Sequence, residues 1–177
     1  PERAEAWGGY LANIEPATWE DLAGALPETM TGAEFLGRGL STADPVTRVQ
    51  PDRAYPVRAA TAHPILENHR VERFASLLDE LAAGADGAAA GMGRLMYGSH
   101  ASYGACGLGS GGTDRLVELV REAGSDRGLF GAKITGGGSG GTVAVLGRGG
   151  ALDAVREIAR AYADETGRAA EVFAGSS

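Results

Sequence analysis

The sequence has little cysteine, few aromatic residues and no long apolar run. Cys106 is the one cysteine among 177 residues, so an internal disulfide is excluded, which fits a reducing compartment such as the cytoplasm. No segment approaches the roughly 20 consecutive apolar residues of a transmembrane helix, and none has the pattern of a secretory signal peptide. Aromatic residues make up 6% of the chain, so a core has to be built mainly from Ala, Leu and Val.

Positive charge is also in the minority. The net charge is -7, and an acidic surface argues against general binding to nucleic acids or membrane surfaces, because both are polyanionic. It leaves open a single phosphorylated small ligand held by main-chain N–H groups. Hydrophobic residues make up 44%, an ordinary globular composition. Because the chain begins at Pro1 rather than at Met, we expect a processed or truncated product.

Glycine is abundant, with 29 residues, and one loop between two expected strands consists almost entirely of it. After Thr135, this loop consists of Gly136, Gly137, Gly138, Ser139, Gly140 and Gly141. A plain hairpin turn needs one or two glycines at most. The excess predicts either that several consecutive residues take positive φ or that the loop lies flush against another surface with no room for a Cβ. Consecutive N–H groups in such a loop can form a concavity that binds anions. Lys133 adds positive charge if it faces the loop. The alternative is a long flexible turn, because the segment matches neither a Walker loop nor a Rossmann fingerprint.

The hydrophobic pattern changes between helical and strand-like periods, which indicates an α+β fold. We expect Tyr10–Ile14 to be a strand or extended segment, Thr18 to cap a helix ending at Leu26, and Thr31 with Glu34 to cap a second helix. A long helix is then expected to have Pro64 in its first turn. Three further helices are expected: Ala88–Tyr103, one that starts at Gly112 or Thr113, and Leu152–Tyr162. The expected strands are Leu129–Ile134, Thr142–Leu146 and Ala170–Phe173. This order predicts helices packed on one face of a small, mostly antiparallel sheet.

A second glycine-rich loop, Gly107–Gly112, also leads into a helix. The N-terminus of a helix favours an anion, but we interpret this loop as a linker between helices, with Thr113 and Asp114 capping the second one.

Three further side chains are candidates for chemistry. His63 and His100 are interpreted as structural, because a lone histidine at a helix start or on a helix more often has a structural role. His69 is on the polar face of the same helix as His63 and is interpreted as solvated. No pair of potential ligands has the spacing of a metal site. Cys106 needs a neighbouring base to act as a nucleophile, and the sequence identifies none, so we interpret it as a small apolar residue.

Several segments, in order and at matching distances, resemble one family. Gly131–Val143 resembles the third motif of the galactokinase, homoserine kinase, mevalonate kinase and phosphomevalonate kinase superfamily, in its galactokinase-like form. Ala62–Val71 is similar to the segment that opens a long helix in these kinases, and Leu95–His100 to a helix that ends in Ser-His. Asn13–Pro16 and Leu26–Met30 also resemble it, so the resemblance covers nearly the whole chain.

The resemblance implies the C-terminal part of a cytoplasmic, ATP- and Mg-dependent sugar 1-kinase. In this superfamily an N-terminal domain supplies the main phosphate loop, the catalytic Asp and most sugar contacts. We expect no catalytic residue and no metal ligand in this chain, and no activity from it alone. Residues 1–56 are then a lead-in segment and residues 57–177 the C-terminal domain. The residues expected close to the ATP phosphates are Thr135, Gly136, Gly137, Gly138, Ser139, Gly140 and Gly141.

Two departures from the galactokinase pattern bear on the sugar. Cys106–Asp114 stands where galactokinases have Cys-Pro-Glu-Leu-Asp, and Ser139 stands where they carry an aromatic residue. Both are similar to the L-arabinokinase branch, which favours arabinose over galactose. The expected partners are ATP, a small sugar and the N-terminal domain of the same kinase, and neither nucleic acid nor membrane. Two alternatives are a sensor that binds sugar and ATP without turnover, and an interaction domain.

Overall fold

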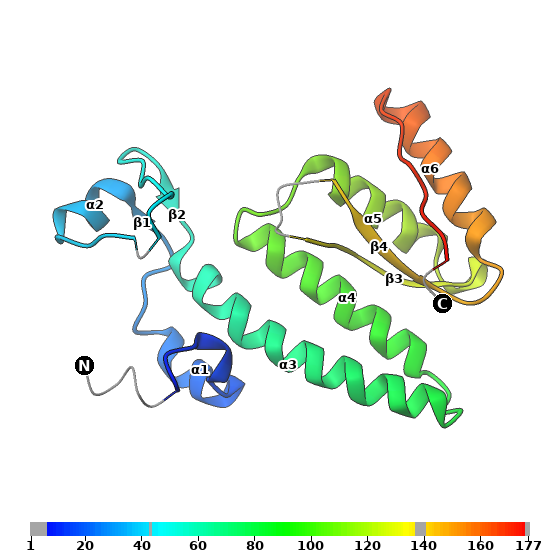
Figure 1. Cartoon of the computed structure of the whole chain (residues 1–177), viewed down its shortest axis with the longest axis horizontal. Coiled ribbons are helices and arrows are strands. Elements are labelled where there is room, and N and C mark those ends of the chain that lie inside the picture. Colours follow the sequence, from blue (N-terminus) through cyan, green and yellow to red (C-terminus); the bar gives the residue numbers. More distant parts are fainter. Residues whose placement is uncertain (1–6, 43, 137–140, 176–177) are drawn as a thin grey trace. The chain divides into compact units, whose positions relative to one another are not determined.

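The computed structural model describes residues 7–42, 44–136 and 141–175. The chain divides into two compact units, Pro1–His69 and Arg70–Ser177. The long helix α3 (Val57–Ala82) runs through the point of division (Figure 1). In the parts of the chain that the structure describes, none of the helices combines the length and the apolarity needed to span a bilayer.

Short elements surround a small core in the first unit. They are η1 (Leu11–Asn13), α1 (Pro16–Ala23), β1 (Met30–Thr31), α2 (Gly32–Gly37) and β2 (Ala54–Tyr55). The two short strands pair antiparallel. Ile14, Trp19 and Ile65 bury their side chains together, and this contact ties the N-terminal segment to the first turns of α3.

The caps of the first two helices differ in how well the sequence predicts them. The box between Thr31 and Glu34 is confirmed, because the Glu34 N–H donates to Thr31 Oγ1 at 3.2 Å and the Thr31 N–H donates to Glu34 Oε2 at 2.8 Å. The cap predicted at Thr18 is wrong: α1 begins at Pro16, since proline fits the first helical position. The extended segment predicted before it is instead the 3-10 turn η1, closed by local hydrogen bonds.

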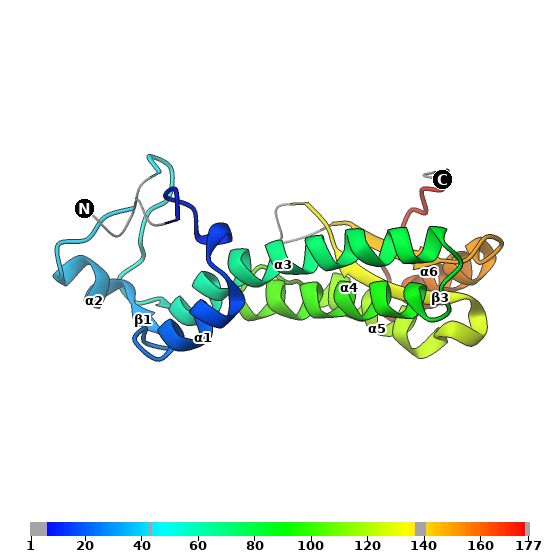
Figure 2. The ribbon, with the colours of Figure 1, turned by 90° about the horizontal axis from the view of Figure 1, so that it is seen from below.

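The second unit combines helices with one β-hairpin. Its elements after α3 are α4 (Ala88–Ala105), α5 (Gly111–Ala123), η2 (Ser125–Arg127), β3 (Leu129–Ile134), β4 (Val143–Gly147) and α6 (Leu152–Thr166). β3 and β4 pair antiparallel. The last turns of α3 lie beside α4, where Leu77 packs on Ala88 and Met92 (Figure 2). The predicted α+β class, with helices packed on a small antiparallel sheet, is confirmed.

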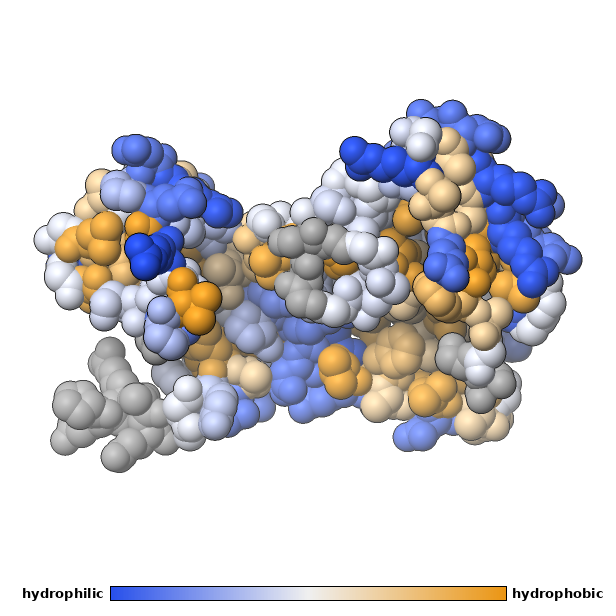
Figure 3. Space-filling model, turned by 45° about the horizontal axis from the view of Figure 1, so that its top comes forward, coloured by the Kyte–Doolittle hydropathy of each residue, from blue (hydrophilic) through white to orange (hydrophobic). Residues whose placement is uncertain are grey.

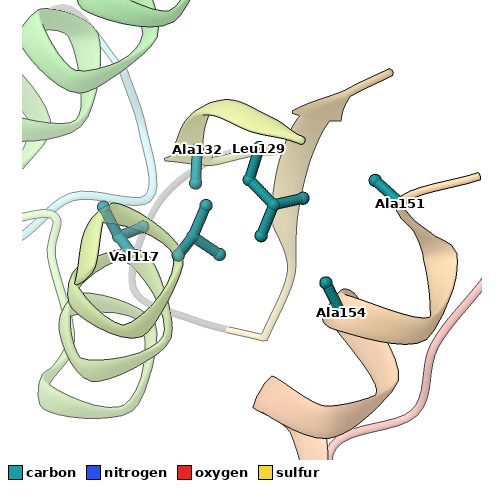
Figure 4. Close-up of a cluster of buried hydrophobic side chains, with 6 residues drawn as sticks. Val117, Leu129, Ala132, Ala151 and Ala154 are labelled. Atoms are coloured by element: carbon teal, nitrogen blue, oxygen red, sulfur yellow. The ribbon is translucent and has the colours of Figure 1, made fainter. Parts of the chain in front are cut away.

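The main core lies between α5, β3 and the start of α6 (Figure 4). Its buried side chains are Val117, Val120, Leu129, Ala132, Ala151 and Ala154. Ala132 is completely buried. Three of these six residues are alanines, so the elements approach one another closely, as the low aromatic content predicts.

Helix α4 covers the edge of β3 that β4 leaves open. Neighbouring residues of a strand turn their N–H and C=O groups to opposite edges. Because the Thr135 N–H bonds to Thr142 in the hairpin, the Ile134 N–H and the Phe130 carbonyl point away from β4. A Cβ on Gly93 of α4 would overlap the Phe130 carbonyl, and a Cβ on Gly131 would overlap the Gly93 main chain. Helix and strand therefore touch through their backbones.

Two predictions about the ends of elements are wrong. Pro64 lies inside α3, not in its first turn, because the Ala-rich segment before it continues the helix back to Val57. Ala170–Phe173 forms no strand in the described part of the chain, and the Phe173 side chain is 81% exposed. A β-branched or aromatic segment becomes a strand only where a neighbouring edge accepts its hydrogen bonds.

Helix α6 turns its charged residues outward (Figure 3) and is tied to α5 by an ion pair. Arg115 Nε donates to Glu165 Oε2 at 2.7 Å, and Nη2 donates to Oε1 at 2.8 Å. These hydrogen bonds lower the pKa of the Glu165 carboxyl below its ordinary value of 4.5.

A carboxyl whose pKa is lower in the folded than in the unfolded protein adds stability above its unfolded pKa, and this stability is lost as the pH falls through the folded pKa. We expect Arg115→Gln to return the pKa of Glu165 toward 4.5. The stability that the wild-type protein loses here as the pH falls should then be absent from the variant. A carboxyl NMR titration measures the shift, and an unchanged titration in the variant would contradict the assignment to Arg115.

Candidate phosphate-proximal site

The site predicted at the glycine loop begins where the hairpin ends. Ile134 and Val143 form the last strand pair, and the Thr135 N–H donates to the Thr142 carbonyl at 3.0 Å. Thr135, Gly136 and Gly141 are exposed at this end of the hairpin. Gly137, Gly138, Ser139 and Gly140 lie outside the described residues.

Both described glycines of the loop have the backbone conformation that their residue type allows. Gly136 has φ +82° and Gly141 has φ +99°, in the region that other residues avoid. No atom lies within 4 Å of the position of a Cβ on either residue, apart from their neighbours in the chain. Glycine is therefore required at these two positions by the turn of the main chain and not by crowding.

Two side chains of α4 contact the strand that leads into the loop. His100 Nδ1 accepts the Ile134 N–H at 3.2 Å, and the Tyr103 hydroxyl donates to the Gly136 carbonyl at 3.3 Å. His100 and Tyr103 lie three residues apart and so share one face of the helix. The sequence predicts a structural role for His100, which these contacts support, but it does not identify Tyr103.

Positive charge lies beside the same strand. The Lys133 ammonium nitrogen lies 5.6 Å from the centre of the Tyr103 ring. The Lys133 ammonium and the Gly136 carbonyl therefore both contact Tyr103. That Lys133 faces the glycine loop stays a prediction.

The second glycine-rich loop is a capped linker. Ser110 caps α5, because its Oγ accepts the Thr113 N–H at 3.3 Å, so the predicted cap by Thr113 and Asp114 is wrong. Asp114 instead places Oδ1 3.2 Å from His100 Nε2. The sequence gives no signal for this contact, which joins the start of α5 to α4.

The other candidate side chains lie on α3 and at the C-terminal end of α4. His63 is the seventh residue of α3, and His69 is exposed on the same helix. Partial burial raises the pKa of the Cys106 thiol, which disfavours the thiolate that a nucleophile needs. Within the described ranges, no group of three or more His, Cys, Asp or Glu side chains is arranged to hold a metal ion.

Comparison with known proteins places the chain in a family. Residues 66–165 match the family model described as GHMP kinases C terminal, more than half of the chain. The chain belongs to the GHMP kinase C-terminal family. It is 44% identical to an L-arabinokinase of Arabidopsis thaliana over 98% of its length, and 34% identical to a galactokinase of Roseiflexus sp. (strain RS-1) over 67%.

This chain matches only a small part of each relative. The match covers 17% of the length of the L-arabinokinase and 28% of the length of the galactokinase. The matched residues 66–165 include α4, the hairpin and the loop between β3 and β4, so the site described above lies within the part that defines the family.

Proposed function

We propose that this chain is the C-terminal part of an ATP- and Mg-dependent sugar 1-kinase that phosphorylates L-arabinose or a galactose-like sugar. The observation that carries the proposal is the 44% identity to an L-arabinokinase over nearly the whole chain. The galactokinase likeness supports the same reaction class with a related sugar. The departures at Cys106–Asp114 and Ser139 favour arabinose.

The loop Thr135–Gly141 is proposed to support the ATP phosphates. Phosphoryl transfer depends mainly on positioning and on stabilising negative charge. Main-chain N–H groups at residues with positive φ, such as Gly136 and Gly141, provide donors for phosphate oxygens. Lys133 adds an ammonium group beside the start of the loop.

The remaining functions of the kinase are assigned to its other parts. The N-terminal domain of the same kinase is proposed to hold the catalytic Asp, the main phosphate loop, the Mg²⁺ ligands and most sugar contacts. The lead-in segment then covers residues 1–56 and the C-terminal domain residues 57–177, beginning with α3 at Val57. The chain alone is expected to be inactive, and the complete kinase to be cytoplasmic.

The first experiment measures ATP consumption by the full-length protein with Mg²⁺ and a panel of sugars. L-Arabinose has the ring stereochemistry of D-galactose without the exocyclic hydroxymethyl group. We expect turnover with both and a kcat/KM for L-arabinose at least about tenfold higher, the scale on which one pocket discriminates one small group. A preference for D-galactose would overturn the arabinose assignment but not the kinase.

The alternative is a sensor related to the kinase, or an interaction domain. A sensor would bind MgATP and sugar without turnover across the panel. An interaction domain would bind neither ligand. Calorimetric titration of the full-length protein with each ligand, beside the turnover assay, separates these cases from an enzyme.

A further inference from the structure

Two hydrogen bonds from α4 hold the main chain just before the loop. His100 Nδ1 accepts a hydrogen bond from the Ile134 N–H. This N–H points away from β4 and so has no hydrogen-bond partner within the hairpin. Tyr103 binds the Gly136 carbonyl from the same face of the helix. The main chain from Ile134 to Gly136 is thereby fixed against α4 on both sides of Thr135.

Asp114 favours the tautomer of His100 that can accept a hydrogen bond from β3. Because Nδ1 accepts a hydrogen bond from Ile134, the ring proton of neutral His100 must be on Nε2. Nε2 faces Asp114 Oδ1 at 3.2 Å, and this carboxylate favours the tautomer with the proton on Nε2. The imidazole is mostly buried, with 13% of its side chain exposed, so its orientation is fixed by the surrounding protein.

We propose that His100, oriented by Asp114, and Tyr103 are positioning residues that fix the main chain of Ile134–Gly136, and with it the start of the loop that binds the phosphates of ATP. The proposal rests on the proposed function of the loop. It extends that function to three side chains outside the glycine segment, one of them on α5. Preorganised donors bind an anion more tightly because they lose little freedom on binding. The main chain that leads into the loop is preorganised by these contacts.

The test uses two replacements of His100 in the full-length protein that separate its two contacts. In His100→Asn, the amide oxygen occupies the place of Nδ1, so the Ile134 contact is kept and the Asp114 contact is lost. In His100→Gln, the amide nitrogen reaches the place of Nε2, so the Asp114 contact is kept and the Ile134 contact is lost. The two variants are matched in chemistry and in polarity.

We expect His100→Gln to weaken MgATP binding about fivefold, as for the loss of one neutral hydrogen bond, and His100→Asn to stay within about twofold of wild type. Tyr103→Phe keeps the ring beside Lys133 and removes only the hydroxyl, and we expect it to weaken MgATP about threefold. The KM for the sugar should change less than about twofold in all three variants, since these contacts touch only the phosphate-side strand.

Hydrogen exchange provides a readout that does not require turnover. The amide of Ile134 should exchange faster in His100→Gln than in wild type and His100→Asn, when the peptide spanning β3 is followed by mass spectrometry. Faster exchange together with weaker MgATP binding supports the proposal. Faster exchange with unchanged MgATP binding overturns it and leaves His100 as a support of the fold alone.

The outcomes for the wild-type protein distinguish this proposal from the function itself. If the protein binds MgATP but transfers no phosphate, the kinase assignment fails, and the affinities of the His100 variants still decide the positioning role. If turnover is found and both His100 variants bind MgATP as tightly as the wild type, the kinase stands and the positioning role is overturned. If the protein binds no MgATP, both are overturned.

Discussion

Replacing Gly93 by Ala should strongly destabilise the second unit. The added Cβ would overlap the Phe130 carbonyl, and Gly131 already brings its own main chain against Gly93. Neither backbone can turn aside as a flexible side chain would. Overpacking of a rigid contact typically costs about 1–3 kcal/mol, and because both partners are main chain we expect about 3 kcal/mol or more. Urea unfolding of the 177-residue chain, followed by circular dichroism, measures the loss.

Gly104 provides the matched control for this prediction. It lies on the same helix, α4, and no atom lies within 4 Å of the position of its Cβ, apart from its own helix and chain neighbours. Gly104→Ala should leave stability unchanged or raise it by up to about 1 kcal/mol, because alanine favours the helix. Equal effects of the two replacements would show that helix propensity, and not the contact with β3, determines the result for Gly93.

The sequence predicts best the elements whose signal is local. β3 is found with its observed bounds, Leu129–Ile134, because a short apolar run ends at a glycine loop. The box of Thr31 and Glu34 needs only residues of its own turn. Ala170–Phe173 has the residue types of a strand, yet whether such a segment pairs depends on an edge elsewhere in the fold, which its own residues do not encode.

Part of the candidate site is likewise predictable from local sequence, and part depends on how the helices pack. The glycine excess at 136–141 and the nearby Lys133 are visible in the sequence, because both lie in one continuous segment. His100, Tyr103 and Asp114 come from two helices, and their contacts with the strand follow from the packing of α4 along its open edge. Gly93 permits this packing, but a glycine inside a helix has no local pattern that distinguishes a close contact from a weak helical position.

Replacing Gly136 by Ala should impair the use of ATP strongly in the full-length protein. Its φ of +82° lies in the region where a side chain costs about 1–2 kcal/mol, so an alanine would move the main chain that precedes the loop. If Thr135–Gly141 supports the phosphates, we expect kcat/KM for ATP to fall at least about tenfold, the equivalent of about 1.4 kcal/mol. Initial-rate kinetics with ATP and the sugar varied separately measure the change, and the KM for the sugar should remain within about twofold.

Gly150, in the turn that leads into α6, isolates the effect of position from the effect of strain. It has φ +89°, and no atom lies within 4 Å of the position of its Cβ, apart from its neighbours in the chain, so Gly150→Ala should lose about as much stability as Gly136→Ala. It lies in another turn of the chain, so its kinetics with ATP should match those of the wild type. Similar melting temperatures with a kinetic defect only in Gly136→Ala would link that defect to the phosphates. An equal loss of kcat/KM for ATP in both variants would mean that backbone strain in the second unit by itself lowers activity, and the proposed role of the loop would fail.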